Sequence, residues 1–300
     1  MAVADTADPH RQVRTALLAA AFVPIWSTGF ILARLVAPHA EPLTFLAVRF
    51  AVACLLLALV AVWKGAAWPQ GLRQWGGALM AGMLIHGIYL GGVFWAVAHG
   101  LPTAISALVA GLQPLLIGIL ARPLLGEAVS RMRWAGIAIG ALGASVTLAP
   151  KLGVAGEGGI PPVPLLVCMA GVVSITLGTI WQKRQSRAAD LTSGTAVQYA
   201  GALVPILLVL SVTGWGAYDV TSLALWAGLA WAVLGLSIGA ILLLFILIRQ
   251  GAVAKVSSLL YLVPGVSAVM AWVSFGETLT LVQIAGLLVA AVGVAAANRG

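Results

Sequence analysis

Polar and aromatic side chains are sparse within the long apolar stretches of this sequence, and their types suit binding a small molecule better than converting it. Trp26 lies beside Ser27 near the middle of the first stretch. His86 and Tyr89 are three residues apart in the third, so they share one face of a helix. Such groups could form a mixed pocket, with aromatic faces for an apolar body and polar groups for a head group. Similar groups in other stretches are Gln113, Thr176, Ser237, Phe245 and Tyr261.

Each of these residues also has a structural interpretation. A single hydroxyl inside a membrane helix more often bonds to a neighbouring helix than to a ligand, and a lone Trp more often packs or faces lipid. An ionisable residue at the depth of His86 is a candidate functional residue, but a neutral His bonded to a neighbouring helix is an equal alternative. The choice depends on the elements that position these side chains.

The composition excludes a soluble domain. Hydrophobic residues make up 62% of the 300 residues and charged residues 8%, whereas a soluble domain carries roughly 25% charged residues. We therefore predict an all-α polytopic membrane protein in contact with lipid. Cys54 and Cys168 lie in apolar stretches and are interpreted as packing residues, and no metal or cofactor is expected.

The apolar stretches predict ten transmembrane helices, because about 20 residues are needed to cross the hydrocarbon core of a bilayer. The predicted spans are 15–35, 42–63, 73–98, 102–121, 130–149, 161–182, 192–213, 223–248, 253–272 and 278–297. With a cytoplasmic N-terminus, 13 of the 16 Lys and Arg residues fall on the inner side, and only Arg34 and Lys151 fall outside. This bias predicts that both termini are cytoplasmic. The net charge of +8 then reflects orientation, and no nucleic-acid partner is expected.

The two halves of the chain repeat each other. Residues 104–143 and 254–293 match at an offset of 150, and near an offset of 149 Arg49 and Phe50 meet Gln198 and Tyr199. Because each unit has five spans, the second must be inverted, as in transporters that work by alternating access. The predicted organisation is a cytoplasmic tail (1–14), a first five-helix repeat (15–149), a periplasmic linker (150–160) and a second five-helix repeat (161–300).

Each repeat carries motifs: Trp26-Ser27-Thr28-Gly29, Pro42-x6-Arg49, Pro114 and Gly126-Glu127 in the first, and Pro264-x11-Gly276-Glu277-x8-Gly286-x6-Gly293 in the second. These motifs resemble the EamA-domain branch of the drug/metabolite transporter superfamily, and within it the YddG-type exporters of aromatic amino acids. The resemblance implies an exporter in the bacterial inner membrane. It also implies that the first, third, fourth, sixth, eighth and ninth spans surround a central cavity.

On those helices we expect the substrate to meet the residues introduced above: Trp26, Ser27, His86, Tyr89, Gln113, Thr176, Ser237, Phe245 and Tyr261. Pro24, Pro114 and Pro264 each remove a backbone hydrogen bond inside a span, and would act as kinks for a rocking motion or as static bends. Gly136-x3-Gly140 and Gly286-x3-Ala290 let backbones approach, either for close packing or for a homodimer through spans 130–149 and 278–297.

Charged residues near the spans set limits on the substrate. Arg49 lies about 9 Å from the outer end of its helix and is expected to snorkel to that interface. The alternative is that it attracts a carboxylate or ties its helix to the rim. Glu127 and Glu277 are each expected to complement a helix N-terminus. All acidic residues fall in tails or at helix ends, which predicts a neutral or zwitterionic substrate. Proton coupling should then be absent or run through His86.

Other classes of protein fit less well. An intramembrane enzyme would need a nucleophile with a base, paired intramembrane Asp residues or a metal motif, and the sequence has none of these. A channel should show charged rings or a repeated filter segment. We therefore expect a metabolite exporter, with aromatic or other neutral amino acids as substrates. The alternatives are an exporter of other metabolites or hydrophobic drugs, and a membrane scaffold without transport activity.

Overall fold

The computed structural model describes residues 9–125, 130–148, 159–185, 190–240, 243 and 262–299. Within this part of the chain every secondary-structure element longer than an isolated β-bridge is a helix, as the composition predicts. The first half contains α1 (Pro9–Val36), α2 (Pro42–Trp63), α3 (Gly71–Gly82), α4 (Tyr89–Ala98), α5 (Thr103–Gly111), α6 (Gln113–Leu125) and α7 (Arg131–Leu148). The second half contains α8 (Pro162–Gln185), α9 (Leu191–Thr213), α10 (Leu223–Ala230), α13 (Val263–Phe275) and α14 (Leu281–Arg299). Two π-helical segments, Met83–Ile88 and Trp231–Ala240, continue α3 and α10.

The apolar helices make this a multi-pass membrane protein. Six described segments have the length and hydropathy of a membrane span: Pro42–Trp63, Gly71–Ala98, Thr103–Leu120, Pro162–Gln182, Leu191–Thr213 and Leu223–Ala240. Four shorter apolar helices are Ala20–Val36, Trp134–Thr147, Val263–Phe275 and Leu281–Gly293. Each of these segments overlaps one predicted span. The count of ten spans and the cytoplasmic placement of both termini stay predictions.

Local sequence signals explain where several helices begin and end. Glu41 caps α2, since its carboxylate accepts hydrogen bonds from the amides of Leu43 and Thr44 at 3.0 and 2.6 Å. Asp190 caps α9 in the same way through the amide of Thr192 at 2.8 Å. At the other end, α13 stops at Gly276, which adopts the left-handed conformation (φ 67°) that glycine tolerates without a steric penalty.

Three predicted spans are less regular than the apolar pattern suggests. The span 102–121 is broken at Leu112, so that α5 ends at Gly111 and α6 begins at Gln113, just before Pro114. The third span of each half contains a π-helical segment, at Met83–Ile88 and at Trp231–Ala240. These two segments lie at matching places in the repeat. Such insertions into the α-helical hydrogen-bond pattern often mark functional sites.

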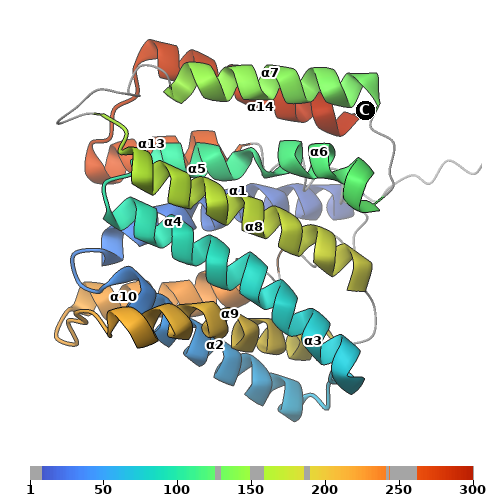
Figure 1. Cartoon of the computed structure of the whole chain (residues 1–300), viewed down its shortest axis with the longest axis vertical. Coiled ribbons are helices and arrows are strands. Elements are labelled where there is room, and N and C mark those ends of the chain that lie inside the picture. The colour runs from blue at the N-terminus through green and yellow to red at the C-terminus, as the bar shows by residue number, and fades with distance from the viewer. Residues whose placement is uncertain are drawn as a thin grey trace, which may run out of the picture.

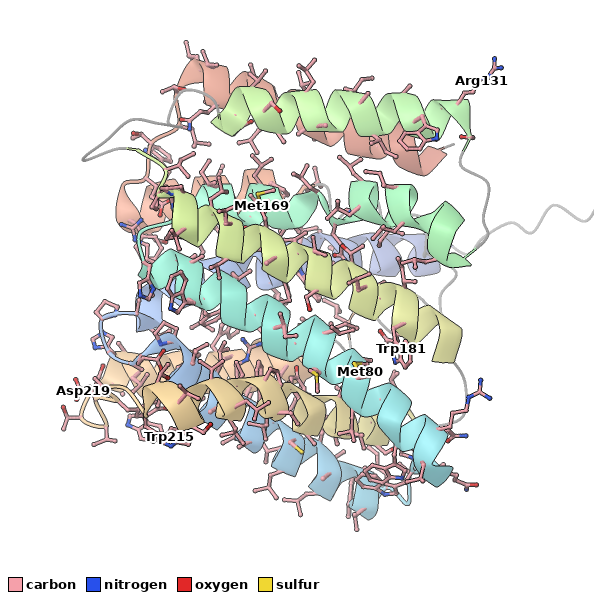
Figure 2. All side chains as sticks on the ribbon, viewed as in Figure 1. Met80, Arg131, Met169, Trp181, Trp215 and Asp219 are labelled. Atoms are coloured by element: carbon pink, nitrogen blue, oxygen red, sulfur yellow. The ribbon has the colours of Figure 1, made fainter. Side chains whose placement is uncertain are left out.

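The helices lie side by side in a bundle (Figure 1). α7 and α14 pack together at one edge, and α2 packs with α9 at the opposite edge. Figure 2 shows Arg131 and Asp219 at opposite ends of the helices, as expected when the helix axes cross a membrane. Large apolar side chains such as Leu72, Val212 and Leu281 are exposed on the outside, where lipid would contact them.

The small residues of the last span in each half pack against each other within one chain. A methyl group at Gly143 would collide with the backbone of Ala290, and one at Gly293 would collide with the backbone of Gly140. The two helices therefore approach each other through the Gly and Ala faces that were expected to suit a homodimer as well as close packing. Because α14 of the same chain occupies this face of α7, the structure gives no support to a homodimer built on it.

Candidate functional site

A cavity of about 110 Å³ lies where the two halves of the chain meet. The first half contributes side chains from α1, from α2 and from the π-helical segment with α4. The second half contributes side chains from α8, α9 and the segment Trp231–Ala240. Its lining consists of Trp26, Gly29, Phe30, Arg49, Ile85, His86, Tyr89, Leu90, Val93, Phe94, Ile175, Tyr199 and Leu236. The lining is thus aromatic and aliphatic, with one permanent charge.

Arg49 supplies that charge, and its position corrects the prediction from sequence. The side chain is only 5% exposed, and its Nε and Nη2 both donate to the Ser237 hydroxyl at 3.3 Å. Arg49 therefore does not snorkel to the outer interface. The reason is the rotation of α2, which packs on α9 and turns this residue toward the centre of the bundle. Ser237, one of the predicted site residues, positions the guanidinium from the second half of the chain.

Aromatic rings form a stack beside the guanidinium. The ring of Tyr199 lies against His86 with centroids 4.8 Å apart, and against Phe50 with centroids 5.7 Å apart. The ring of Trp26 lies against that of Phe22, with centroids 5.3 Å apart, and Trp26 also lines the cavity. Tyr89 is 9% exposed and lines the same cavity one turn from His86. The structure therefore brings together Trp26, His86, Tyr89 and Arg49.

Three other predicted residues serve helix packing. The Ser27 hydroxyl lies 3.5 Å from the carbonyl oxygen of Val263, across the contact between α1 and α13. The Gln113 side chain donates to the Thr179 hydroxyl at 3.1 Å, which joins α6 to α8. Thr176 donates to the carbonyl of Val172 one turn earlier in its own helix. None of the three lines the cavity. Phe245 and Tyr261 lie outside the described residues.

The three prolines differ in their surroundings. α1 continues through Pro24 as a single helix. Pro114 lies in the first turn of α6, directly after the break at Leu112, and Pro264 lies in the first turn of α13. Pro264 packs on Gly111, where a methyl group would come within 2.8 Å of its ring. Pro114 and Pro264 thus stand at helix ends, and of these three prolines Pro24 alone lies inside a long helix.

Tyr199 is the main cavity residue that the sequence predictions did not include. Its signal was the internal repeat, in which Tyr199 is the counterpart of Phe50. The structure stacks these two counterparts on each other. Phe50, which follows Arg49 in the first half, therefore contacts Tyr199, which follows Gln198 in the second half.

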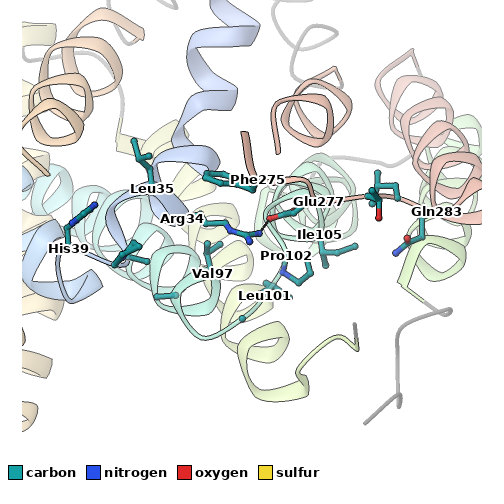
Figure 3. A pocket seen from close by; sticks show the side chains of 16 residues that line it. Arg34, Leu35, His39, Val97, Leu101, Pro102, Ile105, Phe275, Glu277 and Gln283 are labelled. Atoms are coloured by element: carbon teal, nitrogen blue, oxygen red, sulfur yellow. Dashed lines mark hydrogen bonds and ion pairs between the residues drawn. The ribbon is translucent and has the colours of Figure 1, made fainter. Parts of the chain in front are cut away.

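A second, wider pocket of about 670 Å³ lies at one end of the bundle (Figure 3). Here Arg34 forms an ion pair with Glu277 and lies over the ring of Phe275, with its guanidinium carbon 4.8 Å from the ring centroid. The Glu277 carboxylate also accepts from the amides of Thr103 and Ala104 at 3.2 and 3.4 Å. Glu277 thus complements the N-terminus of α5, in the other half of the chain. Glu127 lies outside the described residues.

Comparison with known proteins identifies the family to which this chain belongs. The model of the EamA-like transporter family matches residues 13–149 and 163–299. The chain is 29% identical to the uncharacterized transporter YvbV of Bacillus subtilis over 299 residues, which cover 96% of this chain and 92% of YvbV. It is 26% identical to the uncharacterized inner membrane transporter YedA of Escherichia coli over 259 residues, which cover 86% of this chain and 82% of YedA.

A solved crystal structure shares the fold. It superposes with a TM-score of 0.66 over 95% of this chain and 97% of the other, at 20% sequence identity. The family and the names of the relatives point to a transporter rather than an enzyme. The chain belongs to the EamA-like transporter family, within the drug/metabolite transporter superfamily.

Proposed function

We propose that this protein exports aromatic or other neutral amino acids across the bacterial inner membrane by alternating access. The observation that carries the proposal is the cavity around Trp26, Arg49 and Tyr199, because both halves of the chain contribute to it. A substrate site between two repeats can be opened toward either side when the repeats rock against each other. The aromatic lining suits an apolar side chain, and the buried guanidinium suits a carboxylate.

The wider pocket at Arg34 and Glu277, called the outer pocket from here on, supports the same mechanism. In the predicted orientation Arg34 and Glu277 lie on the periplasmic side, and their ion pair joins α1 of the first repeat to the second repeat. Opening toward the periplasm would separate them, and closure would restore the contact. The packing of α2 on α9 and of α7 on α14 supports an inverted repeat, because each pair joins counterparts in the two halves.

Counterflow in proteoliposomes tests the proposal. Vesicles containing the purified protein are preloaded with one unlabelled amino acid, and accumulation of the labelled compound is measured across a panel. We expect accumulation of at least one aromatic amino acid, and its loss in Trp26→Ala. Trp215→Ala, a change at an exposed Trp outside the cavity, should transport like the wild type. Indifference to every aromatic amino acid would defeat the assignment of substrate, and indifference to the whole panel would defeat amino-acid transport.

Other substrates remain alternatives within the same mechanism. Other neutral metabolites fit the mixed lining. Hydrophobic drugs that carry a positive charge fit poorly, because the cavity already holds a buried guanidinium. The panel should therefore include one neutral and one cationic hydrophobic compound.

A further inference from the structure

We propose that the cavity selects its substrate as a monoanion: a monocarboxylic acid with an aromatic or branched apolar body, whose carboxylate binds Arg49, whereas an added amino group weakens binding. This inference rests on the proposed transport function and shifts its preferred substrate from amino acids to monocarboxylic acids. It depends on the charges that surround the cavity.

The first step is that Arg49 has no acidic partner. In the described part of the chain the one ion pair is that of Arg34 with Glu277, at the end of the bundle. The hydrogen bonds from Arg49 go to the neutral hydroxyl of Ser237, through Nε and Nη2. No described group accepts a hydrogen bond from Nη1. A buried charge without a counter-ion is costly, and an anion that enters the cavity would relieve that cost.

The second step is that the whole sequence offers no acid to replace that anion. The eight acidic residues lie in the tails or at the ends of the predicted spans, and this holds for the undescribed segments too. These residues are Asp5, Asp8, Glu41, Glu127, Glu157, Asp190, Asp219 and Glu277. The cavity therefore has a cation for a carboxylate but no carboxylate for a substrate ammonium. A guanidinium can hold a carboxylate through two parallel hydrogen bonds, which matches a single acid group.

The third step concerns the rest of the substrate. Trp26, Phe30 and Phe94 face the same cavity as Arg49, together with aliphatic side chains such as Leu90. Flat and branched apolar groups fit these surfaces. A substrate with two negative charges would need a second cation to pair with, and Arg49 is the only Lys or Arg that lines the described cavity. The charge balance therefore favours one carboxylate on an apolar body.

Two matched series of compounds test the inference on the full-length protein in detergent, by isothermal titration calorimetry. Indole-3-propionate, tryptophan and tryptamine share one ring and differ in which charged groups they carry. The compounds 4-methylpentanoate, leucine and 3-methylbutylamine form the aliphatic series. In at least one series we expect the acid to bind about tenfold or more tightly than the amino acid, and the amine not to bind, because the ammonium lacks a partner and meets the guanidinium.

Variants assign the effect to Arg49. Arg49→Gln should weaken binding of the acid by about tenfold or more, and Arg49→Lys should lie between Gln and wild type, because an ammonium keeps the charge but loses the paired geometry. Arg131→Gln removes an exposed Arg at the start of α7 (Figure 2) and should bind like the wild type. If Arg49→Gln does not fold, the two compound series on the wild type still decide the question.

The outcomes separate this inference from the proposed function. An amino acid that binds as tightly as its acid, an amine that binds, or no binding by any of the six compounds overturns the inference. Counterflow of an amino acid in the same preparation would then leave the proposed transport function standing. If no amino acid shows counterflow but the acids bind in the expected order, the anion site stands and the amino-acid assignment fails.

Discussion

Arg34 at the end of α1 pairs with Glu277, although 243 residues separate them in sequence. The same carboxylate accepts from the amides of Thr103 and Ala104, so one side chain joins α1, the start of α5 and the segment before α14. In the predicted orientation and the proposed mechanism, this contact would hold the periplasmic side closed. The Arg34 side chain is 43% exposed, so the ion pair alone contributes little.

Glu277→Gln should open the outer pocket more often. The lost charge weakens contacts worth about 1 kcal/mol in total, which corresponds to a shift of about fivefold in the equilibrium. The measurement is the rate at which an impermeant maleimide labels Ile105→Cys, a buried residue of this pocket, with Cys54 and Cys168 changed to Ala. Asp190→Asn removes the charge of the residue that caps α9, outside the pocket, and serves as the control. An unchanged rate would show that Glu277 does not hold this side closed.

Gly143→Val should destabilise the contact between α7 and α14. The backbone of Ala290 occupies the space that the new side chain would need, so the helices must separate, at a cost of about 2 kcal/mol. We expect a lower melting temperature in detergent, measured by size-exclusion chromatography after heating. Gly265→Val is the matched control, because a methyl group there meets nothing within 4 Å. Equal melting of the two variants would contradict the close packing.

His86→Gln tests the source of any proton coupling. His86 is the one His that lines the cavity between the halves, and no Asp or Glu of the sequence falls well inside a predicted span. Export by the variant should therefore proceed at the same rate with and without a proton ionophore, even if the wild type responds to it. The readout is efflux of labelled substrate from preloaded vesicles. A strong response to the ionophore that persists in His86→Gln would place the coupling elsewhere.

The sequence was most informative about where the helices lie along the chain and least informative about which face of each helix points into the bundle. Apolar length located the helices, since each described apolar segment overlaps one predicted span. Arg49 was assigned to the wrong face of its helix, because an almost uniformly apolar helix gives no periodic signal for its inward side. The same lack of signal explains why Ser27 was assigned to the cavity when it packs on α13.

Other features depend on contacts between the halves. Glu277 was expected at a helix N-terminus because it precedes the last span, but the helix that it complements is α5, which spacing alone did not show. Tyr199 entered the sequence analysis only as the counterpart of Phe50. Its place in the cavity follows from how α2 packs on α9, which a single sequence does not reveal.

The central claim is that one cavity between the halves opens to each side of the membrane in turn. The most direct measurement uses Leu90→Cys, a half-buried cavity residue, with Cys54 and Cys168 replaced by Ala. An impermeant maleimide is applied to right-side-out and to inside-out vesicles. Val212→Cys, an exposed position near the end of α9, should label from one side only. We predict that Leu90→Cys labels from both sides and that a transported compound slows both reactions. Labelling from one side only, or no protection by such a compound, would contradict alternating access through this cavity.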